Sequence, residues 1–284
     1  MRLTIGARLF EGPGPFLMGI VNATPDSFSD GGRFLDPEAA VAQAVRLVAE
    51  GADLVDVGGE STRPGAPSVP ADEEIRRVVP VIERLRARGL AVPISVDTAK
   101  GAVARAALAA GADLVNDVSG LGDPELGRAA AEARVPVVLM HTRGTPAEMQ
   151  SRAVYGDVAA EVAAELRAVL DRAVAAGIDP GAVILDPGIG FAKTAEQNVE
   201  LLARVGELRA LGRPLLVGPS RKSFIGKLTG APVGERLPGT LAAVVACALA
   251  GVELLRVHDV AACRQAALVA AALRDAGASR AGPR

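Results

Sequence analysis

Four side chains that can bind an anion lie at the ends of short apolar runs: Arg63, Lys222, Arg256 and His258. Arg256 and His258 are two residues apart, so on a single strand their side chains point to the same side. A planar guanidinium and a compact ammonium together suit phosphate or diphosphate. Taken singly, Arg256 can pair with a neighbouring aspartate and His258 can cap the following helix. The four together predict an anion site.

A second set of polar side chains is flat and rich in hydrogen-bonding groups. Asp97, Asn116 and Asp186 each lie within or directly after another apolar run. A carboxylate accepts two parallel N–H bonds, and an amide both donates and accepts. Asp186 alone, in LDPGIG, could simply form a turn before Pro187. The three together favour a heterocycle with N–H and C=O groups on one edge, such as a pterin or a purine.

Two polar loops could close over such a ligand. They read NATPDSFSDGG (22–32) and GGESTRPG (58–65), and each contains a glycine pair that could act as a hinge. Lys222 follows the seventh apolar run, where barrels often bind phosphate, although a Schiff base of the aldolase kind is another role for it. The sequence has no HExxH or Cys/His metal motif. Asn22, substrate phosphates and water would satisfy the preferences of Mg²⁺.

These residues need a scaffold, and the chain repeats one unit that can supply it. A helical, Ala-rich stretch ends at Gly, a usual helix stop, and is followed by a short apolar run and a polar cluster. The apolar runs, which we expect to be strands, are 16–22, 54–59, 93–97, 114–118, 136–141, 183–187, 214–218 and 254–258. The helical patterns are 38–50, 72–88, 100–110, 124–133, 157–176, 196–210, 239–250 and 260–276.

Unbroken alternation of strand and helix predicts an α/β fold of the (β/α)₈ TIM-barrel type. A doubly wound open sheet is the alternative. We expect one domain over 1–284, with its core at about 16–276 and a disordered tail, ASRAGPR. In such barrels the active site lies at the C-terminal ends of the strands. Those ends form a polar ring: Asn22, 58–63, Asp97, Asn116, His141, Asp186, 220–222, Arg256 and His258.

The composition excludes several classes of protein. The 284 residues carry a formal net charge of -2, 2% aromatic residues and no Trp, which is unlike a nucleic-acid-binding protein. No uncharged apolar segment is long enough for a membrane span, and the N-terminus lacks the apolar core of a signal peptide. Cys247 and Cys263 lie in helical patterns and are expected to be buried apolar residues. We expect a cytoplasmic protein.

Seven ordered motifs resemble those of the dihydropteroate synthase family. They are NATPDSFSDGG, GGESTRPGA, NDVSG, MHTRGTPAEMQ, DPGIGFAK, GPSRKSFIG and LRVHDV, and the resemblance covers residues 16 to about 260. It implies a transferase of folate biosynthesis that joins (7,8-dihydropterin-6-yl)methyl diphosphate to 4-aminobenzoate and releases diphosphate. It also implies a (β/α)₈ barrel, Mg²⁺ as cofactor, a homodimer and sensitivity to sulfonamides.

The resemblance assigns a role to each motif. It implies that the pterin is bound by Asp97, Asn116, Met140, Asp186 and Lys222. The diphosphate set is Asn22, Thr62, Arg63, Arg256 and His258, with Asn22 also contacting Mg²⁺. The wall around aminobenzoate is Phe28, Thr62, Arg63, Pro64, Phe191 and Ser223. The catalytic residues are Asp97, Lys222 and Arg63. Two positions depart from the family pattern, Thr142, where Met is more usual, and Ala192, where Gly is.

The expected mechanism is dissociative. Cations and Mg²⁺ absorb the charge of the leaving diphosphate, Asp97 stabilises the pterin cation, and the amine attacks without a general base. Three alternatives stay open: a methyltetrahydrofolate-dependent methyltransferase, a non-catalytic pterin-binding paralogue and a Schiff-base aldolase at Lys222. The first has no need of the four anion-binding residues. The second would be expected to lose Asn22 or the two polar loops, which this chain keeps.

Overall fold

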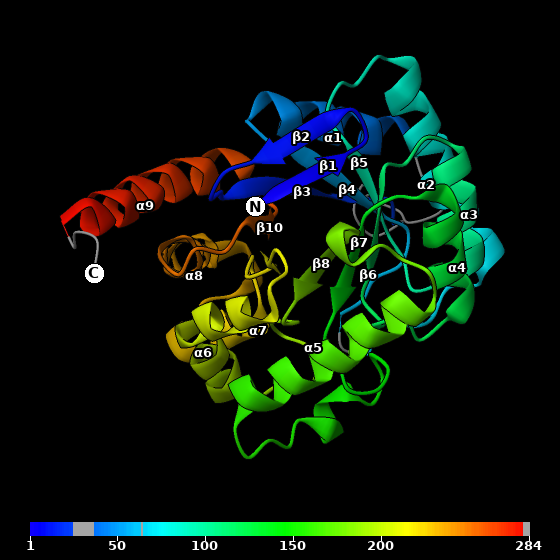
Figure 1. Cartoon of the computed structure of the whole chain (residues 1–284). Coiled ribbons are helices and arrows are strands. Elements are labelled where there is room, and N and C mark those ends of the chain that lie inside the picture. Colours follow the sequence, from blue (N-terminus) through cyan, green and yellow to red (C-terminus); the bar gives the residue numbers. More distant parts are fainter. Residues whose placement is uncertain (25–36, 64, 281–284) are drawn as a thin grey trace.

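A parallel barrel forms the centre of the computed structural model, which describes residues 1–24, 37–63 and 65–280 (Figure 1). Its strands follow the order β8-β7-β6-β5-β4-β3-β10-β9. They are β3 (Phe16–Asn22), β4 (Leu54–Gly58), β5 (Ile94–Asp97), β6 (Leu114–Asp117), β7 (Val137–Met140), β8 (Val183–Asp186), β9 (Leu216–Val217) and β10 (Leu254–Val257). Almost every strand residue is buried, as expected for strands covered on both faces. The predicted strands and the barrel fold are confirmed.

Helices surround the barrel on its outer side (Figure 1). They are α1 (Pro37–Ala49), α2 (Ala71–Ala87), α3 (Gly101–Ala109), α4 (Pro124–Ala133), α5 (Val158–Ala175), α6 (Ala195–Ala203), α7 (Ser223–Thr229), α8 (Leu237–Leu249) and α9 (Val260–Arg280). Short 3-10 helices occur at Met149–Arg152, Pro180–Ala182, Val205–Leu211 and Val233–Glu235. Among the described residues, no helix has the length and apolar character that crossing a membrane requires.

The helix boundaries agree with those predicted from the sequence at some places and differ at others. Gly51 and Gly177 lie just beyond the ends of α1 and α5 with φ of 103° and 89°, in the left-handed region that favours glycine. The single helix predicted over 196–210 is divided into α6 and a 3-10 helix, and the short α7 was not predicted. Helix α9 continues through Arg280, into the segment expected to be disordered. Residues 281–284 lie outside the described residues.

The two strands where the barrel closes, β8 and β9, share little backbone pairing. β9 has two residues, and its contact with β8 is the bridge between Leu185 and Leu215, supported by a bond from Leu185 N to Pro214 O at 2.9 Å. Every other neighbouring pair of barrel strands has a regular parallel ladder. Hydrogen bonds therefore contribute less to closure here than elsewhere around the barrel.

An N-terminal hairpin, which the sequence reading did not predict, covers the opposite end of the barrel from the predicted site. It consists of β1 (Arg2–Ile5) and β2 (Arg8–Glu11), paired antiparallel. Leu3, Ile5 and Phe10 are buried in a cluster with inward residues from the first halves of the strands: Met18, Leu54, Leu114, Val138, Ile184, Leu216 and Leu254. The hairpin side chains therefore fill the N-terminal end of the barrel.

Candidate active site

A pocket opens at the C-terminal ends of the strands, where the predicted ring of polar residues lies. Its lining consists of Thr62, Asn116, Val118, Met140, Asp186, Ile189, Phe191, Gly218, Lys222 and Arg256. Seven of these ten residues were assigned to a binding site from the sequence. They converge because the carboxyl ends of parallel strands meet on one face of a barrel.

Arg256 belongs to a buried cluster of charges beside this pocket. Its Nε donates to Asp56 Oδ2 at 2.6 Å, and its Nη2 donates to Asp97 Oδ2 at 2.7 Å. Asn116 Nδ2 donates to the same oxygen of Asp56 at 2.9 Å. The pairing of Arg256 with an aspartate, considered above as an alternative, is therefore what the structure shows. Among the described residues its Nη1 has no hydrogen-bond partner, and this nitrogen stays available to an anion.

Two carboxylate oxygens of this cluster have unused hydrogen-bonding capacity. Oδ1 of Asp56 and Oδ1 of Asp97 are buried and accept no hydrogen bond from the described residues. A buried acceptor without a donor is costly, so a ligand N–H or a water is needed to satisfy it. Burial raises the pKa of Asp97 to about 7, against the opposing effect of Arg256. This carboxylate is suited to a bound donor or to positive charge.

Asp186 ends β8 on the pocket wall. Its Oδ1 accepts from Gly188 N at 2.7 Å, so the turn expected before Pro187 does form. The carboxylate also lines the pocket, and the turn and the ligand-binding role are therefore compatible. Burial raises the pKa of Asp186 to about 6, and the Gly188 N–H opposes that shift.

Lys222 covers one side of the pocket together with Phe191. Its Nζ lies 4.3 Å from the centre of the Phe191 ring, within the range of a cation–π contact. Burial, and then the positive charge of Arg256, lower the pKa of Lys222 to about 8. The preceding residue, Arg221, has φ of 56° and forms an ion pair with Asp259. This left-handed turn lets adjacent Arg221 and Lys222 point to different partners.

His258 is bound to Ser220 rather than to a carboxylate. Its Nδ1 lies 2.9 Å from Ser220 Oγ, which also accepts from the His258 backbone N–H at 3.2 Å. Burial, followed by repulsion from Arg256 and Arg221, lowers the pKa of His258 to about 3. We therefore assign a neutral imidazole whose Nδ1 accepts from the serine hydroxyl, which leaves the Nε2 hydrogen to donate.

The loop after β4 carries two of the predicted residues. Thr62 lines the pocket, whereas Arg63 is exposed and has no side-chain partner within the described part of the chain. The base of this loop is well held: Glu60 Oε1 accepts from Val69 N at 3.1 Å, and its other oxygen pairs with Lys100. Ser223 begins α7 and is exposed. The predicted Phe28 and Pro64 lie outside the described residues.

The expected Mg²⁺ site depends on few protein atoms. Within 1–24, 37–63 and 65–280, no group of three or more His, Cys, Asp or Glu residues could hold a metal ion. Asn22 ends β3 next to Gly58, and its amide has no hydrogen-bond partner among those residues. Its oxygen can therefore serve as a ligand, and Mg²⁺ commonly combines few protein ligands with substrate phosphates and water. The donor set fits that expectation.

Two residues beside the pocket were not predicted from the sequence. Asp56 was counted within an apolar run, although a carboxylate inside a buried strand is itself a signal of a functional position. Lys193, in DPGIGFAK, was assigned no role, and it is buried beside His141 with their nitrogens 3.0 Å apart. His141 was expected in the ring, but its imidazole contacts Lys193 and Glu165 and does not line the pocket.

Comparison with known proteins extends over most of the chain. The model of the pterin binding enzyme family matches residues 18–258. A dihydropteroate synthase of Synechocystis sp. is 50% identical over 274 residues, which are 95% of this chain and 94% of that protein.

Solved structures are similar to an equal extent. Xanthomonas albilineans dihydropteroate synthase with 4-aminobenzoic acid is 51% identical with a TM-score of 0.89, covering 96% of this chain and 98% of that one. The same enzyme in complex with 7,8-dihydropteroate is 48% identical with a TM-score of 0.87, and the match covers 96% of this chain and 99% of that one. A Yersinia pestis dihydropteroate synthase in complex with a sulfonamide drug is 43% identical with a TM-score of 0.90, and the match covers 97% of this chain and 100% of that one.

Proposed function

The chain belongs to the family of pterin-binding enzymes, and we propose on this premise that it acts as a dihydropteroate synthase. The reaction joins (7,8-dihydropterin-6-yl)methyl diphosphate to 4-aminobenzoate and gives 7,8-dihydropteroate and diphosphate, a transferase step of folate biosynthesis. One observation carries the proposal: the buried side chains of Asn116 and Asp186 line a pocket together with Phe191 and Lys222. Asp97 lies next to Asn116 on the neighbouring strand, and its buried Oδ1 has no donor among the described residues. This arrangement is complementary to the donor-rich edge of a pterin.

The side chains proposed to bind pterin are buried and ordered before the substrate arrives. Asp186 presents a carboxylate, and Asn116 is oriented by its bond to Asp56. Met140 and Phe191 supply apolar surface for the flat ring. Because these side chains are packed before substrate arrives, little binding energy is used to order them.

The diphosphate is assigned to the rim above the pterin. Lys222 lines the pocket. Within 1–24, 37–63 and 65–280, His258 Nε2 and Arg256 Nη1 have no hydrogen-bond partner, so both can donate to an anion. Arg63 is an exposed cation on the adjacent loop, and Thr62 lines the pocket beside it. Asn22 would hold Mg²⁺, which neutralises charge on the departing diphosphate when it is bound. These donors favour a leaving group that gains negative charge.

Bond breaking leaves positive charge on the pterin methylene. The ionised carboxylate of Asp97 stabilises that charge, and Arg256 fixes its orientation at 2.7 Å. The aromatic amine is already a neutral nucleophile, so we assign no general base. Phe28, Thr62, Arg63, Pro64, Phe191 and Ser223 are proposed to surround 4-aminobenzoate and any sulfonamide that replaces it.

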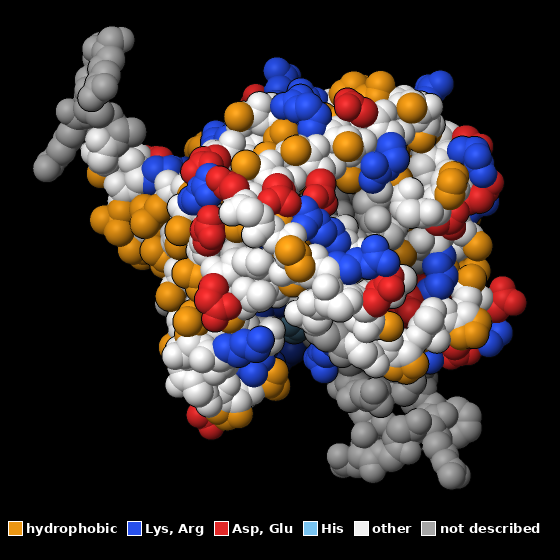
Figure 2. All heavy atoms as spheres, turned by 90° about the horizontal axis from the view of Figure 1, so that it is seen from below, with side chains coloured by type: hydrophobic (Ala, Val, Ile, Leu, Met, Phe, Trp, Pro, Cys, Tyr) orange, Lys and Arg blue, Asp and Glu red, His pale blue; other side chains and the backbone are white. Residues whose placement is uncertain are grey.

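We further propose a cytoplasmic homodimer that pairs through α8 and α9. Leu268, Val269 and Leu273 of α9 are 59%, 62% and 61% exposed, and Leu249 of α8 is 45% exposed. Figure 2 shows hydrophobic side chains gathered toward the projecting end of the molecule that carries α9. Contiguous apolar surface of this kind is typical of an interface. Sedimentation velocity over a range of protein concentrations tests the stoichiometry.

The deciding experiment measures release of diphosphate. Release must require both the dihydropterin diphosphate and 4-aminobenzoate, and 7,8-dihydropteroate must appear in equal amount. Release that proceeds equally well without the amine would indicate a hydrolase and contradict the proposal. A Schiff base at Lys222 would need an aldehyde or ketone substrate, which neither reactant supplies, so 7,8-dihydropteroate formed from these two reactants also separates the proposal from an aldolase mechanism.

A further inference from the structure

Lys193 is a buried lysine that the proposed mechanism does not use. Its Nζ lies 3.1 Å from Gly188 O, 3.0 Å from Phe191 O and 3.0 Å from His141 Nδ1. An ammonium has three hydrogens, so these three acceptors match its capacity. The side chain is almost fully buried and does not line the pocket, which leaves it no hydrogen to offer to substrate.

The two contacts of the His141 imidazole, with Lys193 and with Glu165, define its tautomer. Burial lowers the pKa of Lys193 to about 7, so the charge of the lysine does not by itself decide the tautomer. The carboxylate of Glu165 can only accept, so the hydrogen of the neutral imidazole is on Nε2 and Nδ1 accepts from Lys193. That hydrogen is directed to Glu165 Oε2 at 2.9 Å. Burial lowers the pKa of His141 to about 4, consistent with a neutral ring. A relay of hydrogen bonds therefore joins the loop after β8 to the end of β7 and to α5.

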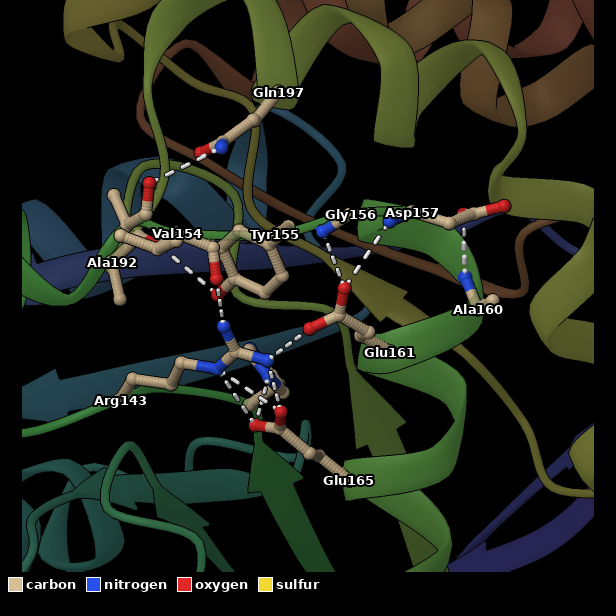
Figure 3. Close-up of polar contacts among 12 residues, drawn as sticks. Arg143, Val154, Tyr155, Gly156, Asp157, Ala160, Glu161, Glu165, Ala192 and Gln197 are labelled. Atoms are coloured by element: carbon tan, nitrogen blue, oxygen red, sulfur yellow. Dashed lines mark hydrogen bonds and ion pairs between the residues drawn. The ribbon is translucent and has the colours of Figure 1, made fainter.

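Arg143 anchors the outer end of this relay (Figure 3). Its guanidinium donates to both Glu165 and Glu161, the latter at 2.8 Å. It also lies 3.8 Å from the centre of the Tyr155 ring. The Tyr155 hydroxyl in turn donates to Ala192 O at 3.0 Å. The loop that contains Lys193 is thus held by a second contact, the Tyr155 hydroxyl, and Arg143 positions that tyrosine by stacking on its ring.

These two attachments enclose the segment 188–193, which includes the pocket residues Ile189 and Phe191. Lys193 binds the carbonyls of Gly188 and Phe191, so it clamps both ends of a tight turn. Ala192 has φ of 46°, a left-handed conformation that costs an alanine free energy and persists only when its surroundings enforce it. The carbonyl of Ala192 is the one that Tyr155 holds.

We propose that Lys193 is a positioning residue for the pterin pocket. By binding the carbonyls of Gly188 and Phe191 and the imidazole of His141, it holds the turn that presents Phe191 to substrate and to Lys222. The inference rests on the proposed function, because it gives the turn a role in binding pterin. Its structural part, that Lys193 sets the shape of segment 188–193, can be tested without any substrate.

The first experiment compares two Lys→Met variants by calorimetry. Lys193→Met removes the buried ammonium but keeps most of the side-chain volume, and Lys227→Met makes the same change at an exposed site on α7. Two ligands are titrated separately: 6-hydroxymethylpterin, which lacks the diphosphate, and Mg²⁺-diphosphate. We expect Lys193→Met to weaken pterin binding by about tenfold to a hundredfold, as for other misplaced binding groups. Mg²⁺-diphosphate binding should change by less than about twofold.

The experiment distinguishes failure of the role proposed for Lys193 from failure of the proposed function. A wild-type protein that binds no pterin would contradict the proposed function, whatever the variants do. A wild type that binds pterin and a Lys193→Met variant that binds it equally well would overturn the inference alone. Equal losses for both ligands, together with a lower midpoint of unfolding, would show that Lys193 serves general stability and would also overturn it.

A spectroscopic probe is available because Tyr155 is the only tyrosine and the chain has no Trp. Its hydroxyl donates to Ala192 O, and such a bond to a carbonyl quenches tyrosine emission. In the ligand-free protein, Lys193→Met should raise this emission as the turn relaxes, and Lys227→Met should not. Unchanged emission would contradict the structural part.

Tyr155→Phe provides a test that does not depend on folding of the lysine variant. Removing one hydroxyl from the second attachment should cause a smaller, but still pterin-selective, loss of affinity. If Tyr155→Phe binds pterin and Mg²⁺-diphosphate as the wild type does, the turn does not govern the pocket and the proposal fails.

Discussion

Arg256 donates from Nη2 to Oδ2 of Asp97 at 2.7 Å, joining β10 to β5 across the barrel mouth, although 159 residues separate them in sequence. The family resemblance assigns the arginine to the diphosphate and the aspartate to the pterin. Their contact makes the two subsites one electrostatic unit, because the arginine charge that meets the anion also compensates a pterin-binding carboxylate. Changes to Arg256 should therefore affect both ligands.

Arg256→Met should weaken pterin and diphosphate binding together and should destabilise the fold. The substitution leaves the buried carboxylates of Asp56 and Asp97 without their cation. Breaking a buried ion pair by removing one partner typically costs about 3 kcal/mol or more. Urea unfolding and calorimetry with each ligand measure these effects. Arg128→Met, which removes an exposed partner of Glu125, is the control and should leave binding unchanged. A loss of affinity for diphosphate alone would show that the two subsites are electrostatically independent.

Asp186→Asn should abolish tight binding of pterin. An amide keeps the acceptor for Gly188 N–H but directs an N–H₂ donor toward the ligand donors. Loss of a charged hydrogen bond with its partner left buried costs roughly 2–4 kcal/mol. Titration with 6-hydroxymethylpterin checks this. An affinity within about twofold of the wild type would remove Asp186 from the binding set.

The same substitution should stabilise the ligand-free protein, and the gain should depend on pH. Burial raises the pKa of Asp186 from 3.8 to about 6 in the folded state. The native state therefore holds its proton more tightly than the unfolded state does. The stability this provides is complete below pH 3.8 and is lost as pH rises through 6.

Asparagine does not ionise, so the variant avoids that loss. Its advantage over the wild type should be small near pH 4 and reach about 2–3 kcal/mol near pH 8. Urea unfolding of both proteins at several pH values gives the difference directly, and groups that titrate in both proteins cancel. If the difference in unfolding free energy between the two proteins does not vary with pH, burial does not raise the pKa of Asp186.

Ala192→Val should destabilise the fold by about 2 kcal/mol or more. A β-branched residue is poorly tolerated at positive φ, and the larger side chain would overfill a packed cluster. Ala192 has φ of 46° and is buried with Met140, Met149 and Phe191. Ala175→Val, at an exposed position of α5, should cost only the difference in helix propensity, about 0.6 kcal/mol. Thermal and urea unfolding compare the two. Similar costs at both sites would mean that the turn accommodates a larger residue.

4-Aminobenzoate should bind weakly to the free protein and more tightly in the presence of Mg²⁺-diphosphate. Arg63, Thr62 and Ser223 contribute to its proposed wall, and Arg63 is exposed without a side-chain partner in the described part of the chain. An anion supplies that partner and so orders the wall. Calorimetry with and without Mg²⁺-diphosphate measures the coupling. Equal affinities would show a preformed wall.

The sequence predicted most of the fold because each strand of a parallel barrel is a nearly continuous apolar run between glycine-terminated helices. It also predicted Asn116, Asp186 and Lys222 as neighbours, since strand ends must converge at one mouth. The hairpin of β1 and β2 was missed because its strands are short and lie outside the repeat.

Pairings across the barrel could not be predicted in the same way. Which carboxylate meets Arg256 depends on how strands β4, β5 and β10 are placed around the barrel, and Asp56 was hidden within an apolar run. Lys193 was harder still, because two of its three partners are backbone carbonyls that any residue could provide. Only the shape of the turn identifies its role.

The N-terminal hairpin has a kinetic consequence. Leu3, Ile5 and Phe10 fill one end of the barrel, so in the part of the chain that the structure describes reactants and products pass through the opposite end, where the pocket lies. Asp97, Asn116 and Asp186, which are proposed to bind pterin, are buried at the strand ends, whereas Arg63 and Ser223, which are assigned to the aminobenzoate wall, are exposed. The pterin must therefore enter first, and an amine that arrives early blocks its way. Since 4-aminobenzoate is expected to bind the ligand-free protein weakly, only a large excess of it should slow turnover, and dihydropteroate should be unable to depart until diphosphate has left the entrance.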